Sequence, residues 1–168
     1  MDYDNIKEIV KNTLSEERYY HSICVAKKCK ELAKIYNIDE REAILVGIAH
    51  DIAKEMSDEE KIKYAKKNNI EIDNVEEKHL GLLHAKIGAD ICKKRFGFTD
   101  KMCTAVLAHT TGLPDMNMLD KILYVSDTCG EDRNFDDIEY VRNLAKEDID
   151  KAMIYLLELE IKNRIEKR

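Results

Sequence analysis

The sequence is poor in residues that break helices or build disulfide scaffolds. Its 168 residues include one proline, six glycines and no tryptophan. Proteins with many short strands usually place glycine or proline in their connections, so this composition argues against an all-β fold. The five cysteines are odd in number and form no C-x-x-C pair, which predicts reduced thiols and argues against a disulfide framework or a cysteine zinc site.

The sequence also lacks a membrane-spanning segment and a basic region. No window approaches the roughly eighteen uninterrupted apolar residues that span a bilayer, and the acidic, amphipathic start "MDYDNIKEIV" is unlike a signal peptide. The net charge is −6, with lysines and acids interleaved, so there is no basic stripe for DNA or RNA. We expect a cytoplasmic protein that binds neither membrane nor nucleic acid. A small polyanionic ligand would have to be held by local cations.

Apolar residues with helical spacing dominate what is present. The first such segment places four side chains on one face: Ile6, Ile9, Val10 and Leu14. With 44% hydrophobic residues the chain can bury one core, so we expect a single domain over residues 1–168. No heptad pattern continues far enough for a coiled coil. The predicted fold class is all-α, a globule of short-to-medium helices.

Capping residues predict where most helices begin. Side-chain oxygens precede the helical segments at Ser15, Ser57, Thr99 and Asn117. The spacing predicts helices over residues 15–36, 39–54, 57–68, 83–96, 99–109 and 117–127, followed by two amphipathic helices at "DDIEYVRNLA" and "DIDKAMIYLLELEIKNRI". The helix over residues 39–54 is apolar on every side between Ala43 and Ala49, which predicts a central position.

Side chains that can bind metal follow several of the apolar runs. The runs "AILVGIA", "LGLL", "AVLA" and "ILYVS" are followed by His50 and Asp51, His84, His109 and Asp127, and His21 lies in the apolar segment "HSICVA". A buried carboxylate must be paired or bound, and helix C-termini attract cations. Imidazole nitrogen and carboxylate oxygen together suit iron, manganese or zinc. We therefore expect one metal site built from separate helices, or a two-metal site that hydrolyses a phosphate bond.

Each of these residues also has a purely structural interpretation. A buried histidine is usually a core residue bonded to a carbonyl, and an aspartate at a helix end is usually a cap. The shared placement of four histidines and two aspartates favours a metal site, although their spacing matches no compact motif such as H-E-x-x-H. A helical scaffold with buried histidines stays an alternative.

The arrangement of His21, the His50–Asp51 pair and Asp127 resembles the signature of the HD-domain metal-dependent phosphohydrolases. Over almost the whole chain, the motifs "R-x-x-H-S", "HDIAK", "LLHAKIGA", "AHTTG" and "LDKILYVSD" are similar to those of the YqeK-type bacterial symmetrical dinucleoside tetraphosphatases. The resemblance implies that a metal-bound hydroxide cleaves diadenosine tetraphosphate symmetrically to two ADP.

The resemblance also implies roles for individual residues. The principal metal, iron by resemblance with manganese or zinc as alternatives, would be bound by His21, His50, Asp51 and Asp127. His84 and His109 would complete a second metal site or contact the phosphates, with Asp51 as the bridge. Arg18, Lys54, Thr110 and Arg133 would lie near the substrate. Asp51, Asp127 and Lys54 are the residues expected to take part in catalysis, Asp127 through proton transfer as well as ligation.

Two segments depart from the family pattern. Gly130, within "DTCGEDR", occupies the place of a usual acid, and Leu113 follows "HTTG" where a basic residue is common. The three expected phosphate-binding cations could instead form surface ion pairs, above all Arg133, which has four acidic neighbours in sequence. The rival functions are an HD nucleotidase acting on mononucleotides and a non-catalytic metal protein that senses nucleotides such as ADP. A homodimer is left open.

Overall fold

The computed structural model describes residues 2–166, and these residues form nine α-helices and no strand, which confirms the all-α prediction. The helices are α1 (Tyr3–Thr13), α2 (Glu16–Ile35), α3 (Glu40–Ala49), α4 (Asp58–Asn68), α5 (Leu83–Ile91), α6 (Asp100–Ala108), α7 (Met118–Cys129), α8 (Ile138–Glu147) and α9 (Ile149–Glu166). A 3₁₀ helix, Leu80–Leu82, leads into α5, and a π-helical turn, Cys92–Phe96, follows it.

The predicted capping residues begin the helices as expected. Ser15 accepts a hydrogen bond from the backbone N–H of Arg18, and Thr99 accepts one from Met102. Ser57 and Asn117 form complete capping boxes at the starts of α4 and α7. These local bonds satisfy backbone donors that would otherwise lack partners at each helix start.

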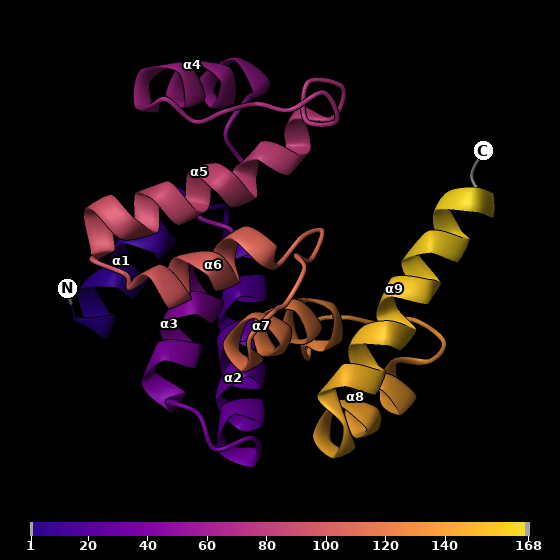
Figure 1. Cartoon of the computed structure of the whole chain (residues 1–168). Coiled ribbons are helices and arrows are strands. Elements are labelled where there is room, and N and C mark those ends of the chain that lie inside the picture. The colour runs from indigo at the N-terminus through magenta and orange to yellow at the C-terminus, as the bar shows by residue number, and fades with distance from the viewer. Residues whose placement is uncertain (1, 167–168) are drawn as a thin grey trace.

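Helices α3 and α7 lie at the centre of the molecule. Helix α7 contacts α2, α3, α6, α8 and α9, and α3 contacts α1, α2, α6 and α7 (Figure 1). The approach of α3 to α2 is very close at Gly47, where an added Cβ would lie 2.7 Å from the Cα of Ala26. This proximity requires glycine at position 47, because the neighbouring atoms are backbone and cannot rotate away.

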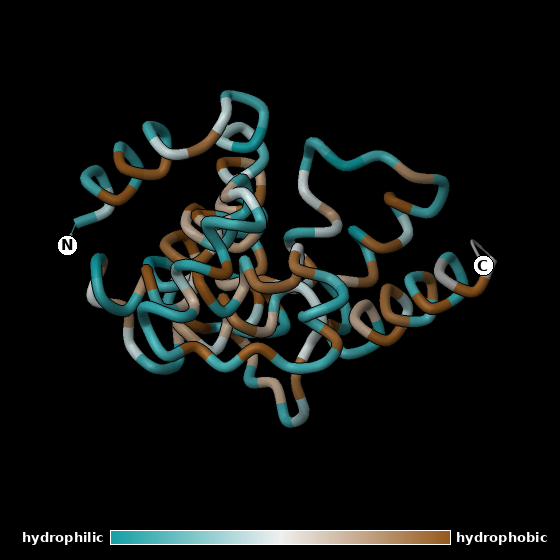
Figure 2. Tube along the Cα trace, turned by 90° about the horizontal axis from the view of Figure 1, so that it is seen from above, coloured by the Kyte–Doolittle hydropathy of each residue, from teal (hydrophilic) through white to brown (hydrophobic). Residues whose placement is uncertain are grey.

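The two terminal helices cover the ends of this central group. Hydrophobic positions recur along α1 and α9 in Figure 2, and Ile6, Val10, Ala152 and Leu156 are buried against the core. Helix α9 packs on α7 and α8, and its C-terminal half extends beyond them (Figure 1). Among residues 2–166 there is no helix with the length and apolar character needed to cross a membrane.

The prediction that one helix continues from residue 39 to Lys54 was wrong, because α3 ends at Ala49. The side chain of His50 donates from Nδ1 to the carbonyl oxygen of Gly47, at 2.8 Å, which is the acceptor that the N–H of Asp51 would use in a continued α-helix. The chain then turns tightly, with the N–H of Lys54 bonded to the carbonyl oxygen of Asp51. The turn directs Asp51 and Lys54 into the interior of the site described below.

Two smaller boundaries also differ from the sequence prediction. The helix expected over residues 83–96 changes to π-helical geometry at Cys92, and α7 continues to Cys129, beyond the expected end at Asp127. As a result, His84 lies in the first turn of α5 and Asp127 lies within α7. Of the four apolar segments that precede the predicted metal ligands, only those before His50 and His109 end an α-helix.

A candidate metal centre

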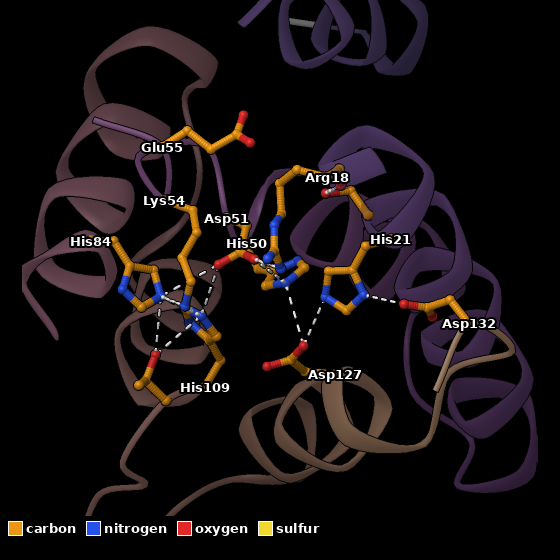
Figure 3. Close-up of polar contacts among 12 residues, drawn as sticks. Arg18, His21, His50, Asp51, Lys54, Glu55, His84, His109, Asp127 and Asp132 are labelled. Atoms are coloured by element: carbon orange, nitrogen blue, oxygen red, sulfur yellow. Dashed lines mark hydrogen bonds and ion pairs between the residues drawn. The ribbon is translucent and has the colours of Figure 1, made fainter. Parts of the chain in front are cut away.

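Six side chains from five helical regions meet in one buried place (Figure 3). His21 comes from the first half of α2, His50 and Asp51 from the end of α3, His84 from α5, His109 from the end of α6 and Asp127 from α7. Each of the four histidines has at most 5% of its surface exposed. The structure therefore brings together all the side chains that the sequence suggested as metal ligands.

Three of the histidines are held in one tautomer by the backbone. The Nδ1 atoms of His50, His84 and His109 lie 2.8, 2.6 and 2.6 Å from carbonyl oxygens three residues earlier in the chain. A carbonyl can only accept, so Nδ1 carries the proton and, in the neutral ring, Nε2 keeps its lone pair. All three Nε2 atoms are turned toward the shared centre.

The donor atoms form two adjoining groups that share His50. The ligand atoms of His21, His50 and Asp127 lie within 4.8 Å of one another, and so do those of His50, Asp51 and His109. His84 adds a further nitrogen, since its Nε2 is 3.3 Å from Asp51 Oδ1 and 3.1 Å from His109 Nε2. Neighbouring imidazole rings are 5.0–5.3 Å apart, between centroids.

This arrangement fits divalent cations. His50 Nε2 and Asp51 Oδ1 are buried and have no hydrogen-bond partner within residues 2–166. Such unpaired buried atoms are costly unless something binds them. The Nε2 atoms of His84 and His109 lie 3.1 Å apart, so with the proton on each Nδ1 they direct their lone pairs into one small volume, as two ligands of one cation do. Four imidazoles and two carboxylates, without a thiolate, form a donor set suited to iron, manganese or zinc.

The electrostatics of the pocket keep its carboxylates ionised. Burial by itself would raise the pKa of Asp51 and of Asp127, but the facing histidines outweigh burial and lower both pKa values below their usual range. Burial lowers the pKa of His84, and His109 and Lys54 act in the same direction, although Asp51 opposes them. Burial acts the same way on His50, yet the charge of Asp51 leaves its pKa raised.

The three cations proposed from sequence all face this centre. Nη1 of Arg18 lies 3.1 Å from Asp51 Oδ2, and Nζ of Lys54 lies 3.3 Å from His84 Nε2. Arg133 donates from Nη2 to Asp127 Oδ1 at 3.0 Å and from Nε to the carbonyl oxygen of Asp127 at 2.9 Å. Within the described residues, Arg133 forms its ion pair with Asp127 and not with its acidic sequence neighbours.

Three further residues lie near this centre or at the edge of the region. The Thr110 hydroxyl lies 3.2 Å from Nε2 of both His84 and His109, so it belongs to the centre. His79, the fifth histidine of the chain, is exposed and lines an adjoining cavity. Leu113 is exposed on the loop before α7.

One residue at the site was missed by sequence reasoning. Asp132 Oδ2 lies 2.7 Å from Nδ1 of His21, on the opposite side of the ring from Asp127 (Figure 3). The two residues are 111 positions apart, and no local motif links them. The only sequence signal was the acidic cluster that follows Asp127, which is equally typical of a solvated loop.

Two cavities adjoin the centre. One, of about 580 Å³, lies beside Asp127 and is lined by Tyr124 and Thr128 of α7, by Phe135 and by polar and apolar side chains of α9. The other, of about 780 Å³, lies beside His84 and is lined by α9 and by five residues outside the α-helices: Val75, His79, Gly81, Leu82 and Thr111. Both are lined by three common residues, Lys54, Thr110 and Glu160.

Comparisons with known proteins agree with this geometry. The family model described as "HD domain" matches residues 18–132. The chain is 34% identical over 148 residues to a protein of Halalkalibacterium halodurans named "Bis(5'-nucleosyl)-tetraphosphatase, symmetrical", covering 88% of this chain and 79% of that one. It is 31% identical over 155 residues to the Bacillus subtilis protein of the same name, covering 92% and 83%.

A solved structure is similar over nearly the full length. It is a "predicted HD superfamily hydrolase involved in NAD metabolism" from Clostridium acetobutylicum, with a TM-score of 0.95 and 34% identity. The likeness covers 99% of this chain and 89% of that one. The helical arrangement that gathers the six side chains is therefore shared with a solved protein structure.

Proposed function

The chain belongs to the HD domain family and, within it, to the group of symmetrical bis(5′-nucleosyl)-tetraphosphatases, and on that premise we propose that it hydrolyses diadenosine tetraphosphate and related dinucleoside tetraphosphates to two nucleoside diphosphates. The observation that carries the proposal is a buried cluster of nitrogen and oxygen donors, bordered by cations, at the junction of two cavities. A dinucleoside tetraphosphate likewise has two nucleosides joined by a highly charged bridge.

We propose that His21, His50, Asp51 and Asp127 hold the principal divalent ion, and that His84 and His109 hold a second one with Asp51 shared between them. Iron is the proposed metal, and manganese and zinc suit the same donors. When bound, such ions polarise phosphate oxygens and lower the pKa of water. The supporting observation is that His50 Nε2 and Asp51 Oδ1 are buried beside other donor atoms and have no hydrogen-bond partner within residues 2–166.

The side chains around this centre bind the phosphates and transfer the proton. Arg18, Lys54 and Arg133 surround the donors and neutralise the phosphate bridge, Arg through its planar fork and Lys as a point charge. Thr110 offers its hydroxyl to a phosphate oxygen. Asp127, ionised and lining the cavity of about 580 Å³, accepts the proton of the attacking water. The water oxygen bonds to one central phosphorus while the bridging oxygen leaves with the other nucleoside diphosphate.

The two cavities favour a dinucleotide over a mononucleotide substrate. A mononucleotide would fill one cavity and leave the other without a role, whereas the two share Lys54 and Thr110 at their junction, beside the donor cluster. Cleavage at that junction yields two equivalent products.

We further propose that residues 1–168 act as one domain in the cytoplasm. The five cysteines are free thiols, as expected of a reducing compartment, and the donors come from helices spread from α2 to α7.

The test is product analysis with purified, iron-loaded protein and diadenosine tetraphosphate. ADP as the only nucleotide product supports the proposal, and ATP with AMP would show that the cleavage position is wrong. Release of phosphate from mononucleotides with the tetraphosphate intact would favour the nucleotidase. Tight ADP binding by metal-loaded protein without turnover would favour a nucleotide sensor. The matched control is Asp51→Asn, which removes one charge from the centre and should lower turnover by at least about 100-fold. Light scattering of the same preparation measures whether the protein is a dimer.

A further inference from the structure

His21 differs from the other three histidines of the centre in how its ring is held. It lies inside the continuous helix α2, where the carbonyl oxygens already accept backbone N–H groups, and the carbonyl three residues earlier also accepts the Ser22 hydroxyl. The backbone arrangement that orients His50, His84 and His109 is therefore not open to it. Its Nδ1 has a carboxylate partner instead, Asp132 Oδ2 at 2.7 Å.

A carboxylate in this position does more than a carbonyl. It fixes the proton on Nδ1, directs Nε2 toward Asp127, 2.9 Å away, and makes Nε2 a stronger electron donor. Figure 3 shows His21 between the two carboxylates, with one ring nitrogen facing each. Asp132 therefore contacts a histidine of the donor set without belonging to the set, and it lines neither of the two cavities.

Gly130 provides the space for this carboxylate. A Cβ at position 130 would lie 2.7 Å from Asp132 Oδ1, closer than real contacts allow, whereas its next neighbours, Ser126 O and Cys24 Cβ, would be at 3.5 and 3.7 Å. Since the crowded atom is the end of a rotatable side chain, an added methyl group would displace the Asp132 carboxylate and leave the backbone in place. The absence of a side chain at position 130 therefore allows the Asp132 carboxylate to keep its place beside His21.

Arg142 of α8 holds the loop that carries these residues. Its guanidinium donates to three backbone carbonyls at the end of α7 and in the loop after it, those of Cys129, Gly130 and Arg133, at 3.1, 2.6 and 3.2 Å. A loop with so many bonds to one side chain has a defined position, and so has the carboxylate that it presents to α2.

We infer that Asp132 is the positioning residue for His21, and that Gly130 and Arg142 build the loop that delivers it. In this chain the carboxylate that orients the first histidine of the metal centre comes from position 132. The inference rests on the proposed metal centre and adds a residue that controls its affinity without binding the ion.

The experiment compares wild type with Asp132→Ala, Asp132→Asn and Gly130→Ala, and with Glu131→Gln as the matched control. Glu131 is adjacent, exposed and paired with Lys27 on the surface. The first readout is the affinity for Mn²⁺, measured by competition with a fluorescent chelator. The second is the ¹⁵N chemical shift of the His21 ring in metal-free protein, which reports the tautomer. Urea unfolding of each variant confirms that it is folded.

Asp132→Ala and Gly130→Ala should weaken Mn²⁺ binding by about 10- to 100-fold, the usual effect of removing such a partner. Asp132→Asn keeps an oxygen that can accept from Nδ1 and should lose less affinity, while Glu131→Gln should match wild type. In the first two variants the His21 ring should show a mixture of tautomers. If folded Asp132→Ala and Gly130→Ala both bind Mn²⁺ as wild type does, the inference is wrong. Should Asp132→Ala fail to fold, Gly130→Ala alone decides.

The result is separable from the proposed function. Wild type that binds Mn²⁺ but leaves diadenosine tetraphosphate intact contradicts the proposed function, and reduced Mn²⁺ affinity in the variants would still support the role of Asp132. Wild type that cleaves the tetraphosphate, with variants of unchanged affinity, overturns the inference alone.

Discussion

Replacing Gly47 by alanine should destabilise the protein, although alanine is the better helix former. The new Cβ would lie 2.7 Å from the Cα and 3.0 Å from the N of Ala26. Carbon atoms in contact prefer about 3.5–4.0 Å, so α2 and α3 would have to separate by roughly 1 Å at this point. Overpacking costs about 1–3 kcal/mol, and the change from glycine to alanine within a helix recovers about 1 kcal/mol. Because backbone atoms are in the way, we expect a net loss of about 1–2 kcal/mol.

The Gly47→Ala substitution should also change the geometry of the metal centre. The carbonyl oxygen of Gly47 accepts the Nδ1 proton of His50, so a shift of α3 moves the one histidine that both donor groups share. Weaker binding of Mn²⁺ should therefore accompany the loss of stability. A substitution that destabilised the fold elsewhere would change the unfolding transition without changing the affinity of the folded protein.

Urea unfolding of the metal-free protein, followed by circular dichroism, measures the first effect. With a slope of about 2 kcal/mol per molar, the midpoint should fall by about 0.5–1 M urea. Gly88→Ala is the matched control, because its Cβ would meet His50 O at 3.4 Å and Val106 Cγ1 at 3.5 Å, both ordinary contacts. That variant should be as stable as wild type or more so. A Gly47→Ala midpoint at or above that of wild type would refute the packing argument.

Three further outcomes follow from the site. Asp51→Asn should lower kcat by at least about 100-fold, the scale of removing one electrostatic group from an active site, and a variant with near-normal turnover would exclude Asp51 from the chemistry. Lys54→Ala should lower kcat/KM by about 10- to 100-fold through loss of a charged contact to phosphate. Glu55→Ala should leave kcat/KM unchanged, because the Glu55 carboxylate accepts from the N–H and hydroxyl of Ser15. Equal losses of kcat/KM in the two variants would contradict a phosphate contact by Lys54. Chelation should lower the Tm measured by calorimetry by about 5–10 °C if the ion was present at about 100 times its Kd, and an unchanged Tm would mean that the folded state holds no stabilising ion.

The local features of this protein could be predicted from the sequence. The helical content and the capping residues Ser15, Ser57, Thr99 and Asn117 depend on contacts between residues three or four positions apart, which spacing alone reveals. The six donor side chains could also be predicted from the sequence, because they lie beside apolar segments and match the motifs of the family. The structure brings these side chains together.

The tertiary structure decided what depends on distant partners. Helix α3 stops at Ala49 because the His50 ring takes the Gly47 carbonyl, and that ring is buried only when α2, α6 and α7 pack around it. Asp132 meets His21 across 111 residues of sequence, and the cavities take their lining from α9 as well as from α7 and the loop before α5. No periodicity or local motif predicts these contacts, because they form only when helices that are distant in the sequence pack against one another.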